Sequence, residues 1–203
     1  YILSIQEKQR ILTNNIFGVD IDREATEVAM MSLYLKLLED GFDRGQAELF
    51  IQGHVLPDLT GNIKCGNSLI DNKFYKNKDV GLFKEKDTRR INAFDWKTEF
   101  PGINGFDCII GNPPYIRIQT MKEWAPLEVE AYKEIYTSAS SGNYDIYVVF
   151  VDKGLQLLSE HGQLGFILPH KFFNAKYGEP LRGIIAKGKH LSRVVHFGDE
   201  QIF

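Results

Sequence analysis

Short apolar runs alternate along this chain with segments in which apolar residues recur at helical spacing. Five apolar runs predict strands; they cover residues 16–22, 63–69, 106–111, 162–169 and 191–197. Apolar residues at helical spacing predict four helices; they cover residues 1–15, 23–38, 143–159 and, after a turn, 171–189. Because strands and helices alternate, the pattern favours an α/β domain built on a parallel sheet.

The strand over 106–111 ends abruptly at Asn112-Pro113-Pro114-Tyr115. This strand is apolar on both faces, as a buried strand of a parallel sheet would be. The two prolines lack backbone donors and bias the residue before them away from helix, so they predict a stiff turn. The Asn112 side-chain oxygen and the Pro113 carbonyl then stand beside the Tyr115 ring, which suits a planar group that carries an amino function. An ordinary strand-ending turn remains open at this point.

Length and composition agree with one α/β domain. The chain has 203 residues, of which 43% are hydrophobic and 12% aromatic, and its formal net charge is −3. A stand-alone DNA-binding protein would carry more Lys and Arg. No apolar run approaches the ~20 residues of a membrane helix, so we expect a soluble, cytoplasmic domain without a membrane segment. We predict no metal site, because the histidines are scattered, and we interpret Cys65 and Cys108 as buried reduced thiols.

Asn-Pro-Pro-Tyr after a hydrophobic strand resembles the catalytic motif of S-adenosylmethionine-dependent amino-methyltransferases. The resemblance is strongest to the adenine-specific DNA methyltransferases of restriction-modification systems, in particular the large type IIG-like methylases. Asp145-Ile146-Tyr147, the glycine-strand-proline segment over 162–169 and the closing Phe-Gly-Asp-Glu-Gln-Ile-Phe follow in the order of that family. The resemblance covers most of the chain and implies a Rossmann-like methyltransferase fold with S-adenosyl-L-methionine as cofactor.

The cofactor residues are expected after the strands over 16–22 and 63–69. An acidic residue at the end of the second strand of a doubly wound sheet commonly binds ribose hydroxyls. We therefore assign Asp20 to the ribose, with Ile21 beside it, and Asp22 to capping the next helix. The resemblance implies that Asn67, helped by Ser68, accepts a hydrogen bond from the cofactor adenine, although a plain β-turn stays open there.

The resemblance also implies a reaction without a metal or a covalent intermediate. An adenine is swung out of double-stranded DNA and held between Tyr115 and Phe203. Asn112 and Pro113 accept the two hydrogens of its amino group, with Pro114 completing the catalytic turn. Asn112 thereby also faces the cofactor. It is therefore expected to be both a catalytic residue and a cofactor-binding residue.

Three further segments are expected at the surface. Residues 71–101 are interpreted as a solvated charged insertion whose end is tucked onto the core by Phe94, Trp96 and Phe100. Residues 116–142 are interpreted as a mobile loop that leaves the catalytic turn, and could close over it. The basic residues of 171–189 could meet a phosphate backbone; they are Lys171, Lys176, Arg182, Lys187 and Lys189.

The chain departs from the family pattern at its ends. No Gly-x-Gly turn precedes Asp20, and we expect the first and last strands of the fold and the target-recognition domain to be missing. We therefore expect residues 1–203 to be a partial methyltransferase catalytic domain that alone binds the cofactor weakly or not at all and does not methylate. A linked or associated restriction endonuclease is an expected partner. The alternatives are a protein glutamine N5-methyltransferase, which shares the motif, and a non-catalytic DNA-binding or scaffold module.

Overall fold

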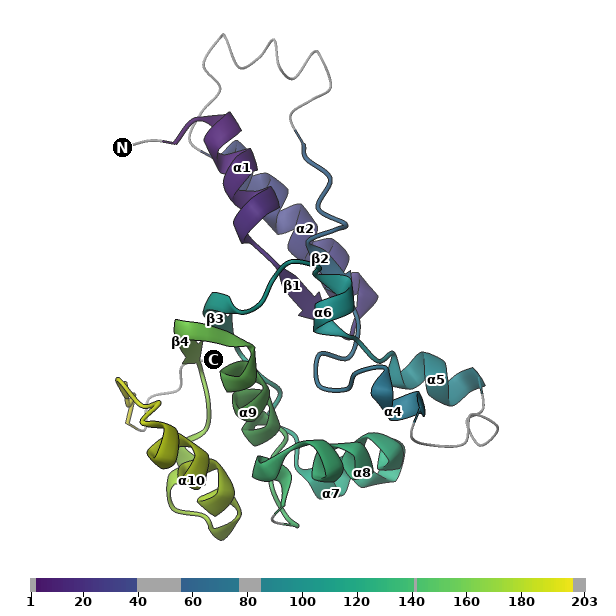
Figure 1. Ribbon diagram of the computed structural model, residues 1–203, viewed down its shortest axis with the longest axis vertical. Helices are drawn as coiled ribbons and strands as arrows, with labels where there is room; N and C mark the ends of the chain where they lie inside the picture. The colour runs from purple at the N-terminus through teal and green to yellow at the C-terminus, as the bar shows by residue number, and fades with distance from the viewer. Residues whose placement is uncertain (1–2, 40–55, 77–84, 141, 199–203) are drawn as a thin grey trace. The chain divides into compact units, whose positions relative to one another are not determined.

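The structure is a computed structural model that describes residues 3–39, 56–76, 85–140 and 142–198. These residues form two compact units, Tyr1–Ile103 and Asn104–Phe203. Each unit combines helices with a pair of parallel strands, which confirms the α/β class (Figure 1). No helix among the described residues is long and apolar enough to cross a membrane.

The first unit opens with a helix-strand-helix arrangement. Its elements are α1 (Ile5–Asn15), β1 (Gly18–Asp20), α2 (Arg23–Leu38) and β2 (Ile63–Cys65). The two strands pair in parallel, with Gly18 opposite Ile63 and Asp20 opposite Cys65. Apolar side chains of both helices and of the segment before β2 form the core; they are Leu12, Leu37 and Leu59, with Met30, Leu33 and Tyr34 against them. The predicted helix over 23–38 is confirmed; the strands predicted over 16–22 and 63–69 are present but shorter, Gly18–Asp20 and Ile63–Cys65.

Local capping explains where these helices begin. Ser4 and Glu7 form a reciprocal capping box at the start of α1. Asp22 is the N-cap of α2, and its Oδ1 accepts the backbone N–H of Glu24 at 2.9 Å. The assignment of Asp22 to capping is therefore confirmed.

The later part of the first unit holds short helices, α4 (Lys73–Lys76), α5 (Glu85–Ile91) and α6 (Trp96–Glu99). Phe94 and Phe100 are buried, and the Trp96 ring lies 5.3 Å and 5.7 Å from their ring centroids. The prediction that aromatic residues anchor the end of 71–101 is confirmed. That 71–101 is an insertion stays a prediction.

The second unit is built on β3 (Phe106–Gly111) and β4 (Leu158–Phe166), which pair in parallel. Between them lie α7 (Ile118–Trp124), α8 (Pro126–Ile135), the 3-10 turn η2 (Thr137–Ala139) and α9 (Tyr147–Leu157). Two 3-10 turns, η3 (His170–Phe173) and η4 (Lys176–Gly178), lead into α10 (Glu179–Gly188). Helix α9 is the centre of the core, because Tyr147, Val148 and Val149 are fully buried.

The prediction of a loop over 116–142 is wrong. Ile118, Met121 and Val129 are buried, so α7 and α8 each pack an apolar side. The Trp124-Ala125-Pro126 stretch that suggested a loop is the junction of the two helices. Pro126 occupies the first turn of α8, where a proline fits a helix because its missing N–H has no intrahelical partner.

The strand predicted over 191–197 is also wrong, because residues 190–197 carry no regular secondary structure. Leu191, Val194, Val195 and Phe197 are all exposed. A sequence with strand propensity forms a strand only where a neighbouring strand supplies hydrogen bonds. Among the described residues, β4 pairs with β3 alone, and no ladder reaches 191–197.

Burial of the strand over 106–111 was expected on both faces, and this expectation is wrong. The side chain of Ile110 is 82% exposed. Cys65 and Cys108 are free thiols, as expected, but both are exposed rather than buried. The reason is that burial on both faces requires helices above and below a wider sheet. In the described residues each sheet has two strands. The Rossmann-like arrangement with missing strands stays a prediction.

Candidate functional site

The Asn-Pro-Pro-Tyr turn follows directly on the carboxyl end of β3. Gly111 ends the strand, and its carbonyl accepts the backbone N–H of Ile167 at 3.3 Å. A Cβ at Gly111 would lie 3.0 Å from the ring of Phe166, so glycine lets the two strands end side by side. Pro113 is buried, whereas Asn112 and Tyr115 are exposed. The turn therefore buries one of its two prolines and exposes its polar side chains.

The hydroxyl of Tyr115 holds the Asn112 side chain in place. It lies 2.7 Å from Asn112 Oδ1 and 3.0 Å from the carbonyl oxygen of Ile167, and donates its single hydrogen to these acceptors. An amide oxygen has two lone pairs, so Asn112 Oδ1 keeps one for another donor. No donor in the described part of the chain reaches the Pro113 carbonyl oxygen. The turn thus offers two hydrogen-bond acceptors.

The ring of Tyr115 is supported from one side. It meets the Tyr147 ring edge-on, with centroids 6.3 Å apart and an interplanar angle of 89°. Tyr147 in turn contacts Phe172, with centroids 6.2 Å apart. Tyr115 itself remains 45% exposed. A planar group can therefore stack on it next to the two acceptors.

Behind this ring lies a chain of polar contacts. The hydroxyls of Tyr147 and Tyr177 lie 2.9 Å apart, and the Tyr177 hydroxyl donates to Asp145 Oδ2 at 3.2 Å. Burial, followed by the hydrogen bond to Tyr177, raises the pKa of Tyr147, and burial also raises the pKa of Tyr177. Both phenols therefore stay neutral near pH 7. Their hydrogen bonds hold the Tyr147 ring against Tyr115.

In the first unit, the predicted cofactor residues follow the two parallel strands. Asp20 ends β1, and its Oδ1 accepts the backbone N–H of Asp22 at 2.8 Å. The side chain of Asp20 is exposed, and Ile21 next to it is 54% exposed. The Gly66 N–H donates to the Asp20 carbonyl at 2.8 Å. The carboxyl ends of β1 and β2 therefore lie together.

Asn67 and Ser68 form a β-turn after β2. Asn67 Oδ1 accepts the backbone N–H of Leu69 at 3.1 Å, and the Asn67 carbonyl accepts that of Ile70 at 3.2 Å. Asn67 is buried, whereas the Ser68 carbonyl accepts the indole N–H of Trp96 at 3.0 Å. The plain turn left open by the sequence is present. It does not exclude a ligand, because Asn67 Oδ1 keeps a second lone pair.

Comparison with known proteins identifies the family. The sequence model of the Eco57I restriction-modification methylases matches residues 14–203. The chain belongs to this family. Over its whole length it is 37% identical to RM.Eco57I of Escherichia coli, a type II restriction enzyme and methyltransferase, of which it covers 19%.

Two further relatives are similar to about half of this methylase chain. M.PaeR7I of Pseudomonas aeruginosa, a type II methyltransferase, is 38% identical over 48% of the chain, which covers 16% of that protein. M.BstVI of Geobacillus stearothermophilus, also a type II methyltransferase, is 32% identical over 49% of the chain, which covers 17% of it. The methylase chain thus spans about a fifth, or less, of the length of these relatives.

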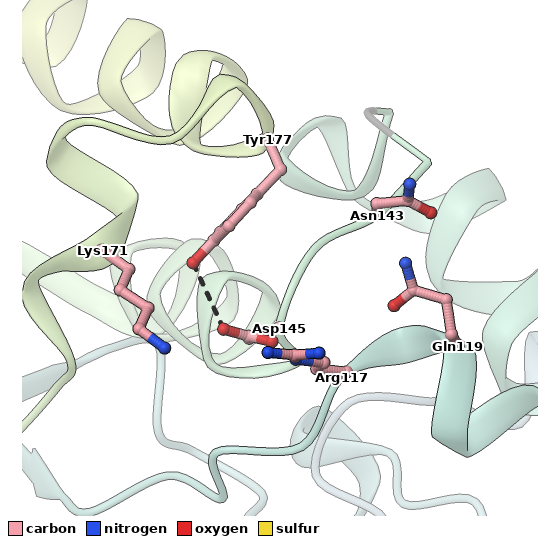
Figure 2. Close-up of a pocket in the computed structure, with 6 residues that line it drawn as sticks. All are labelled: Arg117, Gln119, Asn143, Asp145, Lys171 and Tyr177. Atoms are coloured by element: carbon pink, nitrogen blue, oxygen red, sulfur yellow. Dashed lines mark hydrogen bonds between the residues drawn. The ribbon is translucent and has the colours of Figure 1, made fainter.

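A pocket of about 230 Å³ in the second unit of this methylase chain contains residues that the sequence did not single out (Figure 2). Six side chains line it: Arg117, Gln119, Asn143, Asp145, Lys171 and Tyr177. Only Lys171 and Asp145 belonged to predicted features, the basic segment and the Asp-Ile-Tyr motif. The sequence signal for Arg117 was its place two residues after Tyr115. Tyr177 carried no signal, since its role depends on contacts with residues 30 or more positions earlier.

The predicted residues of this methylase fall into three groups. Asn112, Pro113, Pro114 and Tyr115 form one turn in the second unit. Asp20, Ile21, Asn67 and Ser68 lie at the joined ends of β1 and β2 in the first unit. Phe203 lies outside the described residues. Across the described part of the chain, no three His, Cys, Asp or Glu side chains are grouped to hold a metal ion.

Proposed function

We propose that the protein carrying this chain transfers a methyl group from S-adenosyl-L-methionine to the N6 amino group of an adenine in double-stranded DNA. The observation that carries the proposal is the turn after β3. There Asn112 Oδ1 lies 2.7 Å from the hydroxyl of the partly exposed Tyr115, and the Pro113 carbonyl is the next acceptor along the chain. The target adenine is flipped out of the helix to reach them.

The two acceptors account for the activation of an amino group. An exocyclic amine conjugated to a ring is a weak nucleophile until its lone pair is turned out of conjugation. Asn112 Oδ1 and the Pro113 carbonyl each accept one amino hydrogen, which leaves the lone pair facing the methyl donor. Positive charge develops on the nitrogen as it is methylated, and two fixed oxygen dipoles stabilise it. Because prolines hold the turn rigid, the geometry is set before the substrate arrives.

Stacking on Tyr115 offsets part of the cost of base flipping. Unstacking a base costs a few kcal/mol, and contact with an aromatic ring returns about 1–3 kcal/mol. The support of Tyr115 by Tyr147 keeps that ring in one orientation. We assign Phe203 to the second face of the base, as the resemblance implies.

The residues at the ends of β1 and β2 fit the nucleoside part of the cofactor. S-adenosyl-L-methionine supplies an electrophilic methyl group on a sulfonium. Asp20 uses one carboxylate oxygen on Asp22 and has its other oxygen for ribose hydroxyls. Ile21 offers an exposed apolar surface to the adenine ring. Asn67 Oδ1, with the Ser68 hydroxyl, can accept from the adenine amino group. Asn112 completes the cofactor-binding residues, next to the methyl group that is transferred.

The family favours DNA over a glutamine side chain as substrate. The relatives bear the names of type II methyltransferases, and one is a combined restriction enzyme and methyltransferase. We therefore propose a role in a restriction-modification system, with a linked or associated endonuclease and a target-recognition domain as partners. The names of these relatives favour a DNA methyltransferase over the glutamine methyltransferase and over the non-catalytic module.

Replacing Asn112 tests the proposal. Asn112→Ala removes one of the two acceptors, and loss of one preorganised catalytic dipole lowers kcat by about 100- to 1,000-fold. The measurement is N6-methyladenine formed in duplex DNA, quantified by mass spectrometry, with cofactor affinity measured by calorimetry. We expect methylation to fall to that extent and cofactor affinity to stay nearly unchanged.

Asn174→Ala is the matched control, because Asn174 is exposed in the same unit and its side chain takes no part in the hydrogen bonds that join the turn to Ile167. It should methylate DNA as the unmodified protein does. Methylation by a folded Asn112→Ala protein at the unmodified rate would refute the assignment of Asn112. Failure of the unmodified protein to methylate any DNA would refute the proposed function itself.

A further inference from the structure

The pocket behind the catalytic turn gathers hydrogen-bond donors from four separate segments (Figure 2). Arg117 and Gln119 come from the start of α7, and Asn143 comes from the segment before α9. Lys171 and Tyr177 come from η3 and η4. Two cationic groups and two side-chain amides thus face one small space.

The charge in this pocket favours an anion. Arg117 and Lys171 form no ion pair with any described residue, whereas Asp145 accepts the hydroxyl of Tyr177 at 3.2 Å. Burial raises the pKa of the Tyr177 phenol, with the Asp145 carboxylate adding to the rise and the Arg117 charge opposing it. Tyr177 is therefore neutral, and two cations against one carboxylate leave a net charge of +1 in the pocket.

The size and donor set of the pocket match a single tetrahedral anion. Its volume of about 230 Å³ is below the roughly 300–1,000 Å³ of pockets that enclose whole small-molecule ligands. Arg offers a planar fork of N–H donors, Lys a point charge, and Gln119 and Asn143 neutral N–H donors. This combination is typical of protein contacts to phosphate oxygens.

The pocket is rigidly joined to the catalytic turn. The segments after Tyr115 and before Tyr147 run antiparallel, with Arg117 opposite Asp145. Two backbone bonds of 2.9 Å close this pair, from Ile118 N–H to the Tyr144 carbonyl and from Ile146 N–H to the Ile116 carbonyl. A ligand held by Arg117 therefore has a fixed position relative to Tyr115.

We propose that this pocket binds a backbone phosphate of the DNA strand that carries the methylated base, with Arg117 and Lys171 as its charged contacts. The inference rests on the proposed function, because the phosphate belongs to the nucleotide whose base is proposed to stack on Tyr115. Contacts to phosphates fix the register of a protein on DNA. The pocket therefore positions the target nucleotide for the acceptors of the turn.

The test is the salt dependence of DNA binding by the protein that carries this chain. The affinity for a fluorescent duplex is measured by anisotropy over a series of salt concentrations. The slope of log K against log salt changes by about 0.9 for each phosphate contact. We expect the double variant Arg117→Gln with Lys171→Gln to bind DNA more weakly. The magnitude of its negative slope should be smaller by about 0.9.

Lys122→Gln with Lys133→Gln is the control, because both lysines are exposed on α7 and α8 and lie outside the pocket. It removes the same charge and should leave the slope unchanged. An unchanged slope in the pocket variant, with the unmodified protein methylating DNA, would overturn the inference and leave the proposed function standing. An equal change of slope in both variants would overturn it as well.

Inorganic phosphate separates two sources of the ligand. Its effect on the melting temperature is measured for the unmodified protein and for the pocket variant. If phosphate stabilises only the unmodified protein while the DNA slope is the same in both, the pocket is a site for a free anion and the DNA assignment fails. If the unmodified protein binds DNA but methylates nothing, the proposed function fails. The slope of the salt dependence then still shows whether the pocket contacts a DNA phosphate.

Discussion

Tyr115 combines two tasks that a single substitution can separate. In the proposed reaction its ring stacks on the flipped base, while its hydroxyl holds Asn112 Oδ1 at 2.7 Å. If Asn112 Oδ1 activates the amino group as proposed, its position controls the chemical step. We therefore expect the hydroxyl to act on that step and the ring to act on the binding of the base.

Tyr115→Phe keeps the ring and removes the hydroxyl. A typical hydrogen bond contributes about 0.5–1.5 kcal/mol, so we expect the methylation rate to fall by up to about tenfold. DNA affinity should stay nearly unchanged. Tyr115→Ala loses both tasks, so it should weaken DNA binding as well as slow methylation. Single-turnover methylation and DNA affinity, measured on both variants, check this. Equal losses of DNA affinity in both variants would contradict it.

Local chemistry allowed part of this site to be predicted from the sequence. Prolines fix the backbone around Asn112 wherever the chain goes, and Asp22 caps the helix that begins one residue later. The bond from Tyr115 to the Ile167 carbonyl could not be predicted, because it joins residues 52 positions apart. The same is true of Tyr177, whose partners are brought to it by the packing of α9 against α10.

Among the elements, α1 and β2 are joined through one buried amide. The Asn62 side chain donates to the carbonyl oxygens of Thr13 at 2.8 Å and Ile16 at 2.9 Å, where α1 ends. The backbone carbonyl of Asn62 accepts the N–H of Gly18 at 2.9 Å, at the start of the β1–β2 ladder. Asn62 thus satisfies the end of the helix and fixes where the first strand begins.

Asn62→Ala should therefore destabilise the first unit. Removing the donor leaves two partly buried carbonyls without this partner, and an unsatisfied buried acceptor costs up to about 1–3 kcal/mol of unfolding free energy. Urea unfolding followed by circular dichroism measures the loss. Asn14→Ala is the control, because Asn14 is exposed in the last turn of α1; surface changes of this kind stay within about 0.5 kcal/mol. Equal stability of the two variants would show that the Asn62 contacts contribute nothing.

Elements were predictable where pattern and local signals agreed. The helix over 23–38 has both apolar spacing and an Asp cap, and α2 spans the same residues. Residues 116–142 carry Trp, Pro and Ser that suggested a loop, but their apolar side is recognised only by the neighbours that bury it. Residues 191–197 have strand propensity, and they lack the partner that a strand requires.

At the scale of the whole molecule, the sequence and the structure disagree on what covers β3. The apolar run of this strand predicted burial on both faces, yet Ile110 is 82% exposed and Cys108 is exposed. Such a strand in a two-stranded sheet presents apolar surface that can attract another chain. The chain 1–203 by itself should therefore tend to self-associate.

Ile110→Lys distinguishes an exposed from a buried strand in the chain 1–203. If the side chain faces water, the change should alter the unfolding free energy by no more than about 0.5 kcal/mol, as at other surface positions. It should also reduce self-association measured by light scattering, because it adds charge to an apolar face. Ile118→Lys is the matched control; Ile118 is fully buried in α7, and an unpaired charge there should unfold the second unit. A loss of stability at Ile110 as large as that at Ile118 would show that β3 is packed on both faces, as the sequence pattern predicted.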